Sequence, residues 1–181
     1  MLTPAPRTRR FARALPPRAA DYSQHEVLDA VASLHPAIEV PSSRYCDFVS
    51  VGEAQLIADN ACAHYFVLGQ ATTADWRAID LAAYPVQGEV VGRLTREGKG
   101  ANVLGDPRIA LTWLVNKLSH IGVGIAADET VTTGTCVVPM EARAGDHVIA
   151  DFGRLRIEPD IPAQIDITHL SQWLNNHLEL E

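Results

Sequence analysis

The side chain best placed for chemistry is Glu39, which lies between Ile38 and Val40 in a short apolar run ended by Pro41. An acid within an apolar strand is costly to bury unless a cation or a cluster of hydrogen-bond donors meets it. Glu39 is therefore a metal ligand, a catalytic acid, or a strand residue that faces water. The residues around it must decide among these roles.

Histidine and cysteine offer weaker candidates. The seven histidines show no HxH or HExxH spacing, so the sequence does not predict a zinc site. The cysteines are Cys46, Cys62 and Cys136, an odd and widely spaced set. This spacing indicates reduced thiols in a cytoplasmic protein, and neither a disulfide framework nor a CxxC zinc site.

Composition narrows the classes of protein. A chain of 181 residues, of which 47% are hydrophobic, can bury one good core. The net charge of −7 argues against a nucleic-acid partner. No apolar run reaches the roughly 20 residues needed to span a bilayer, so we expect no membrane partner. Residues 1–20 contain five arginines and no acid, which is typical of a transit peptide, a basic arm, or an altered beginning of a longer protein.

Two helices and several strands should position Glu39. Ser23 and Glu26 predict a capping box, and apolar residues then recur at helical spacing as far as His35-Pro36, with the strand of Glu39 following. Further strands are expected at residues 65–68, 79–86, 89–95 and 147–152. Asp106 and Pro107 predict the start of a largely buried helix that extends to residue 121.

The expected domain organisation has three parts. Residues 1–20 form a basic Pro/Arg-rich arm, residues 21–158 form the domain, and residues 159–181 form a tail. An apolar stripe in residues 166–181 predicts an amphipathic helix that docks on the body or on another copy of the chain: Leu170, Trp173, Leu174 and Leu178. The sum is a β-rich α+β domain with two or three packed helices.

Four segments carry a family resemblance. They are HPAIEVPSSRYCDF, IADNACAHYFVLG, LGDPRIALTWLVNKLSHIG and TTGTCVVPMEARAGDHVIADFGRL. Taken in order, and covering roughly residues 20–155, they resemble the fumarylacetoacetate-hydrolase superfamily, and within it the 2-keto-4-pentenoate hydratase and 4-oxalocrotonate decarboxylase group. No single segment is specific, because GD turns and DP helix starts are common; their order makes the match.

The resemblance implies a mixed β-sandwich roll. It also implies a lyase that adds water to, or decarboxylates, short 2-oxo or 2-hydroxydienoic acids from aromatic-compound degradation. Mg²⁺ or Mn²⁺ would be the cofactor, because a hard divalent ion stabilises the enolate formed from such an acid. A homo-oligomer, possible association with a related decarboxylase or hydratase, and a small 2-oxo acid as ligand are the implied partners.

The resemblance also assigns roles to individual residues. Glu39 matches a metal ligand and a catalytic carboxylate, and Asn60 matches a catalytic position in the stretch that lines the pocket. Cys62, where a serine is frequent, is implied to contact substrate, with tight packing of small residues as the alternative. The loop Thr133, Gly134 and Thr135 is implied to receive the substrate carboxylate, since hydroxyl and backbone N–H donors suit an anion. The alternative for this loop is an ordinary strand-end turn.

One part of the family pattern is missing. Relatives carry two further carboxylates in a Glu-x-Glu strand after a Pro-Arg pair. Here Pro6-Arg7 leads to Arg9 and Phe11 at those positions. The resemblance is then to a member that lacks its N-terminal portion and part of its metal site. The alternative role for Glu39 is an ion pair with Arg44 or with the arginine-rich start of the chain. Two hypotheses follow, a catalytic lyase and a non-catalytic remnant or partner subunit.

Overall fold

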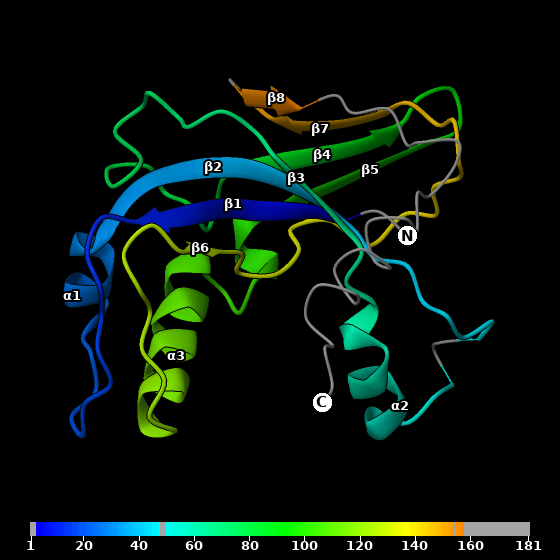
Figure 1. Ribbon diagram of the computed structural model, residues 1–181. Helices are drawn as coiled ribbons and strands as arrows, with labels where there is room; N and C mark the ends of the chain where they lie inside the picture. The colour runs from blue at the N-terminus through cyan, green and yellow to red at the C-terminus, as the bar shows by residue number, and fades with distance from the viewer. Residues whose placement is uncertain (1–2, 48–49, 154, 158–181) are drawn as a thin grey trace.

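The computed structural model describes residues 3–47, 50–153 and 155–157 of the chain. Two four-stranded sheets form its framework, with strand orders β3-β2-β1-β6 and β5-β4-β7-β8, and every strand pairing described is antiparallel. Figure 1 shows β1 and β2 as long curved strands, with α1 and α3 below one end and α2 below the other. The expected β-rich α+β roll with packed helices is confirmed.

The element bounds are as follows. The first sheet comprises β1 (Thr3–Phe11), β2 (Val31–Val40), β3 (Tyr65–Leu68) and β6 (Thr130–Val131), and the second comprises β4 (Pro85–Val90), β5 (Leu94–Lys99), β7 (Val148–Phe152) and β8 (Leu155–Ile157). The α-helices are α1 (Gln24–Asp29), α2 (Glu53–Ala58) and α3 (Pro107–His120). Two 3₁₀ turns are η1 (Asn60–Cys62) and η2 (Gly100–Asn102).

Both predicted helix starts are confirmed. The Ser23 hydroxyl accepts the backbone N–H of Glu26, whose carboxylate accepts the backbone N–H of Ser23 in return, which completes the capping box. At α3 the Asp106 carboxylate accepts the N–H of Arg108, and Pro107 occupies the first turn. Such caps form from residues a few positions apart, which is why the sequence alone identifies them.

The helix that begins at Ser23 is shorter than predicted. It ends at Asp29, and Val31 and Leu34, which we expected on its apolar stripe, belong to β2. Both are fully buried, and they pair with Phe11 and Arg9 of β1. Strand pairing therefore overrides a helical spacing of apolar residues that extends over only a few positions.

The strand expected at residues 79–86 is also shifted. The chain turns from residue 76 to residue 83, and β4 begins only at Pro85. Gly88, expected to precede the next strand, lies inside β4, and β4 turns into β5 at residues 91–93. The strands at residues 65–68 and 148–152 are confirmed. The amphipathic helix predicted for residues 166–181 lies outside the described residues.

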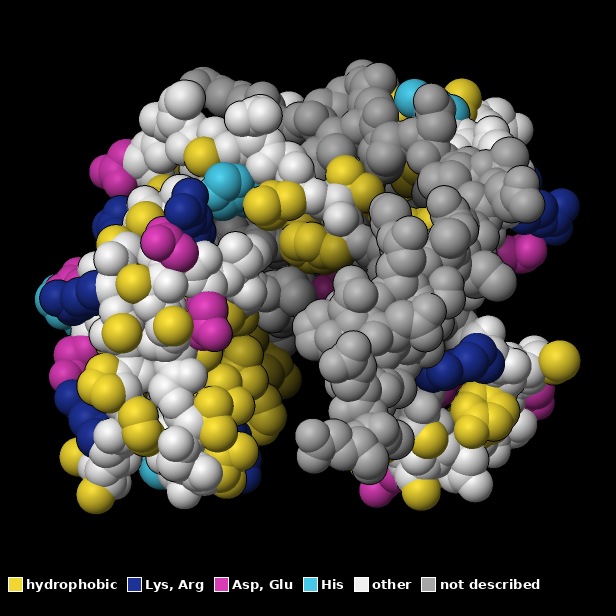
Figure 2. All heavy atoms as spheres, viewed as in Figure 1, with side chains coloured by type: hydrophobic (Ala, Val, Ile, Leu, Met, Phe, Trp, Pro, Cys, Tyr) yellow, Lys and Arg dark blue, Asp and Glu magenta, His cyan; other side chains and the backbone are white. Residues whose placement is uncertain are grey.

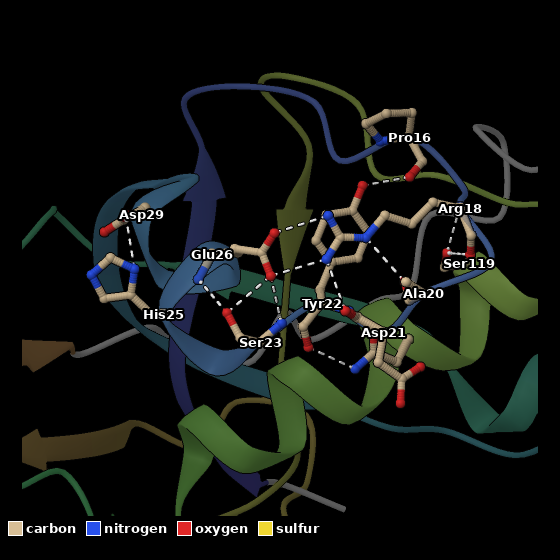
Figure 3. Close-up of polar contacts among 11 residues, drawn as sticks. Pro16, Arg18, Ala20, Asp21, Tyr22, Ser23, His25, Glu26, Asp29 and Ser119 are labelled. Atoms are coloured by element: carbon tan, nitrogen blue, oxygen red, sulfur yellow. Dashed lines mark hydrogen bonds and ion pairs between the residues drawn. The ribbon is translucent and has the colours of Figure 1, made fainter.

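The basic start of the chain differs from the expected arm. Residues 3–11 form β1, the central strand that pairs with β2 on one side and with β6 on the other. Arg18 then anchors the following loop: its guanidinium binds both carboxylate oxygens of Glu26 at 2.9 Å and lies 3.6 Å from the centre of the Tyr22 ring (Figure 3). The Ser119 hydroxyl accepts the backbone N–H of Arg18 and donates to its carbonyl oxygen, which ties the same loop to α3. Residues 3–20 are thus expected to contribute to the stability of the fold.

The buried side chains form two cores. The first lies between the sheets and includes Ile38 and Val40 of β2 together with residues of β4 and β7. The second packs α1 and α3 against β1 and β2, with Phe11 and Leu111 fully buried. Figure 2 shows that hydrophobic side chains are also exposed over the lobe that contains α3. None of the helices in the described ranges has the length and hydrophobicity of a membrane span.

Candidate functional site

Glu39 lies near the end of β2, between two neighbouring strands. Its register partners are Thr3 of β1 and Phe66 of β3. Directly paired residues of antiparallel strands lie on the same face of a sheet. Ile38 and Val40 lie on the other face, in the first core. Glu39 therefore faces away from that core, and it is half-buried rather than fully exposed to solvent.

The loop that follows β2 is held by a buried acid, Asp59. The Asp59 side chain is almost fully buried and accepts hydrogen bonds from the Ser43 hydroxyl and the Arg44 Nε, both at 2.6 Å. These donors hold the pKa of the Asp59 carboxyl below its ordinary value, the Ser43 hydroxyl first and the Arg44 guanidinium second. Arg44, considered above as an ion-pair partner of Glu39, therefore forms its ion pair with Asp59.

Asn60 and Cys62 belong to a strained turn docked on the same loop. Asn60, Ala61 and Cys62 have φ values of 52°, 51° and 63°, in the left-handed region that non-glycine residues rarely adopt. The Ser42 N–H donates to the Cys62 carbonyl oxygen at 2.8 Å and so holds the turn beside the end of β2. Backbone strain of this kind is common at functional sites, although it does not identify one by itself.

The side chains of this turn differ in accessibility. Asn60 is exposed, whereas the Cys62 side chain is buried. Exposure leaves the Asn60 amide accessible to a ligand. Burial of Cys62 agrees with the alternative that it packs among small residues.

The loop Thr133, Gly134 and Thr135 follows β6. Because β6 runs antiparallel to β1, the chain leaves it towards the Thr3 end of β1, which is the end paired with Glu39. Gly134 has a φ of 113°, a conformation that favours glycine. The Thr135 hydroxyl donates to the Val137 carbonyl oxygen at 2.8 Å, so a local turn already uses this predicted donor.

Two hydroxyl groups before that glycine have a different environment. The Oγ1 atoms of Thr132 and Thr133 are buried, and neither has a hydrogen-bond partner within the described part of the chain. A buried polar group without a partner costs about 1–3 kcal/mol, and such a group in a folded protein calls for an explanation. Thr132 was not among the predicted site residues, because its sequence neighbours give no signal for burial of the hydroxyl.

The two positions predicted for further carboxylates are not beside Glu39. Arg9 pairs with Leu34, five residues before Glu39 and roughly 16 Å away along the strand. Phe11 pairs with Val31 and is fully buried in the second core. In the register of β1, the partners of Glu39 and Ala37 are Thr3 and Ala5.

The donor set is poor for a divalent cation. Mg²⁺ and Mn²⁺ are held by several hard oxygen ligands, of which carboxylates are the strongest. Glu39 contributes one carboxylate, and no group of three or more His, Cys, Asp or Glu side chains forms among the described residues. These residues therefore do not fit the metal that the family resemblance implies.

The structure brings the predicted residues to one end of the first sheet. Glu39 lies on β2, the Asn60–Cys62 turn docks just beyond it, and the chain from Thr133 to Thr135 runs towards the same end from β6. Two cavities elsewhere are lined by described residues, with volumes of about 320 Å³ and 490 Å³. Neither is lined by a residue of β2.

Several known proteins resemble this chain in sequence and in structure. No protein-family model matches it. The 2-hydroxyhexa-2,4-dienoate hydratase of Comamonas testosteroni is 32% identical over 139 residues, which are 75% of this chain and 52% of the hydratase. The 2-keto-4-pentenoate hydratase of Paraburkholderia xenovorans (strain LB400) is 32% identical over 124 residues, 68% of this chain and 45% of that enzyme. The chain spans about half the length of these curated relatives.

A solved structure agrees with these relatives. The 4-oxalocrotonate decarboxylase from Pseudomonas putida G7, complexed with magnesium and adipate, superposes with a TM-score of 0.75 and 26% identity. The match covers 87% of this chain and 59% of the decarboxylase. Sequence and fold thus point to the same group of proteins as the four segments singled out above. The chain belongs to the fumarylacetoacetate-hydrolase superfamily, in the group of 2-keto-4-pentenoate hydratases and 4-oxalocrotonate decarboxylases.

Proposed function

We propose that this protein acts on short 2-oxo or 2-hydroxydienoic acids, as a lyase that adds water or releases carbon dioxide. The curated relatives with these activities support the proposal. Because the chain spans about half of their length, the activity of the whole relatives does not transfer by similarity alone. The proposal therefore also needs support from the site.

The observation that carries the proposal is the pair of buried hydroxyl groups on Thr132 and Thr133. A ligand carboxylate would accept the hydrogen bonds for which the described residues provide no acceptor. β1 alone separates β2 from the continuation of β6, which is about 10 Å across the sheet, and Glu39 lies about 10 Å further along the strands than Thr133, so the two are roughly 14 Å apart. A short oxo acid with its carboxylate at the hydroxyl groups could extend towards Glu39.

Glu39 has suitable chemistry for a proton transfer in such a substrate. A carboxylate can take the proton of a 2-hydroxydienoate hydroxyl and return it to a carbon atom of the substrate, which converts the enol to the 2-oxo form. The exposed Asn60 amide could hydrogen-bond the oxygen atom involved. This proton transfer involves no metal ion, because the described residues do not form a site for one.

Replacement of the two threonines by valine tests this assignment. Thr133→Val and Thr132→Val remove an unsatisfied hydroxyl and keep the shape, so the free protein should melt at the same or a higher temperature. In both variants, 2-oxopentanoate should no longer raise the melting temperature as it does in the wild type. Neither variant should reduce the ultraviolet absorption of the dienoate. Thr135→Val is the matched control: its hydroxyl has a partner, so this variant should be less stable and still bind the ligand. Full ligand response in Thr133→Val and Thr132→Val together would refute the assignment.

A second candidate is a non-catalytic subunit that binds an oxo acid without turning it over. The unsuitable donor set for a divalent cation favours this candidate. Titration of the wild type with Mn²⁺, followed by electron paramagnetic resonance, separates the two. Tight Mn²⁺ binding that Glu39→Gln removes would exclude the second candidate.

The register of β1 provides a positive control for that titration. Thr3→Glu together with Ala5→Glu would introduce two carboxylates at the register partners of Glu39 and Ala37. This double variant should gain Mn²⁺ affinity, and adding Glu39→Gln should remove the gain. Thr3→Gln with Ala5→Gln is the matched variant without charge and should bind no Mn²⁺.

A further inference from the structure

We propose that the protein selects oxo acids with an apolar tail over oxo acids with a second carboxylate, and that Phe66 and Leu68 determine this preference. The inference rests on the proposed function and extends it to the class of substrate. The hydratases and decarboxylases related to this chain include enzymes named for substrates of both kinds. The side chains around Glu39 therefore decide which of the two kinds of substrate is preferred.

Phe66 and Leu68 lie on the face of Glu39. Phe66 is the register partner of Glu39, and Leu68 is the register partner of Ala37. Their side chains are 43% and 47% exposed. Large apolar side chains that remain accessible beside a carboxylate offer contact to the hydrocarbon part of a ligand.

Packing in the first core does not explain why Phe66 and Leu68 are apolar. Tyr65 and Val67, which alternate with them along β3, pack against the first core and hold the strand in place. Phe66 and Leu68 point to the opposite face, so neither is needed to anchor β3 to that core. Their apolar side chains can therefore contact a ligand beside Glu39.

Two basic residues near this end of the sheet, His35 and Arg44, are already engaged. His35, four residues before Glu39 and roughly 13 Å away along the strand, contacts the Gly69 carbonyl oxygen through Nδ1 and the Ser33 hydroxyl through Nε2. Both ring nitrogen atoms of His35 are thus engaged within the protein. Arg44 is paired with Asp59.

A second carboxylate on the ligand would thus meet unfavourable surroundings. It would lie against the Phe66 ring, which offers it no hydrogen bond, and near the like charge of Glu39. An alkyl tail of the same length would contact the apolar side chains without either penalty. The preference follows from charge and polarity.

Two ligands with the same head and the same number of carbon atoms test the preference. Isothermal titration of the full chain with 2-oxohexanoate and with 2-oxoadipate should give a dissociation constant at least tenfold lower for 2-oxohexanoate. Phe66→Arg should reduce this ratio at least tenfold, because it adds a cation beside Glu39. Phe66→Leu keeps an apolar surface and should leave the ratio unchanged. Leu68→Arg provides the same added charge at a second position if Phe66→Arg does not fold.

The outcomes separate the two proposals. If 2-oxoadipate binds as tightly as 2-oxohexanoate, or more tightly, the inferred selectivity is wrong and the proposed function stands. An unchanged ratio in a folded arginine variant would also overturn the role of the β3 side chains. If neither acid binds, the proposed function fails and the selectivity fails with it.

Discussion

Gly98 of β5 offers a direct test of how the candidate site is held. A Cβ atom at this position would lie 2.0 Å from the carbonyl oxygen of Cys136 and 2.9 Å from its carbonyl carbon. The Asn102 side-chain amide donates to the same oxygen at 2.7 Å. Because Cys136 directly follows Thr135, the close approach at Gly98 fixes the position of the loop proposed to receive the substrate carboxylate.

The cost of Gly98→Ala can be worked from these distances. A carbon–oxygen contact of about 3.3 Å is the closest that is common, so the Cys136 carbonyl must move by roughly 1.3 Å. Overpacking of this kind costs about 1–3 kcal/mol, and loss of the Asn102 hydrogen bond adds roughly 1 kcal/mol. We therefore expect Gly98→Ala to lower the free energy of unfolding by about 2–4 kcal/mol.

Urea unfolding and ligand titration measure the two consequences. Gly98→Ala should show the reduced stability and at least tenfold weaker binding of 2-oxohexanoate, because the loop has moved. Gly52→Ala is the matched control, since its added Cβ would meet only the end of the flexible Gln55 side chain, at 3.0 Å. A Gly98→Ala protein with the stability and affinity of the wild type would refute the reasoning.

Three further predictions concern the parts that support the site. The pKa of Glu26 is lowered to about 2, chiefly by its hydrogen bonds from Arg18. A carboxyl with a lowered pKa stabilises the fold at pH values above its unfolded pKa, so the free energy of unfolding should decline as the pH falls from about 4.5 to about 2. Urea unfolding at several pH values should show this decline, and a smaller one in Glu26→Gln. Leu111→Ala should lower the free energy of unfolding by about 2–5 kcal/mol in the same assay, because the side chain is fully buried. Asp59→Asn should accelerate limited proteolysis between β2 and β3, whereas Asp75→Asn, on an exposed loop, should not change the rate.

The sequence predicted features that depend on neighbouring residues. The capping box at Ser23 and the Asp106 cap each involve contacts over two or three residues, and both formed as expected. The end of α1 and the strand nature of residues 3–11 depend on pairing between β1 and β2, whose partners are up to 36 residues apart in the case of Thr3 and Glu39. Pairing over such distances leaves no periodic signal in either segment alone.

The candidate site, too, was predictable from the sequence only in part. Glu39 and the loop from Thr133 to Thr135 were identified from the resemblance of their segments, and the structure adds their common end of the sheet. The burial of the Thr132 hydroxyl and the anchoring role of Asp59 became evident only in three dimensions. The burial of the Thr132 hydroxyl and the contacts of Asp59 with residues about 15 positions earlier arise from packing between segments.

Asp59 also explains how the strained turn persists. Three successive residues in the left-handed region, Asn60 to Cys62, cost roughly 1–2 kcal/mol each, and a free loop would relax out of this conformation. Asp59 immediately precedes the turn, and its contacts with Ser43 and Arg44 fix the turn to the loop that leaves β2. That loop begins directly after Glu39 and Val40, so the position of the turn and the end of β2 are coupled through one carboxylate. The geometry of the candidate site therefore depends on a buried acid that need not contact the substrate.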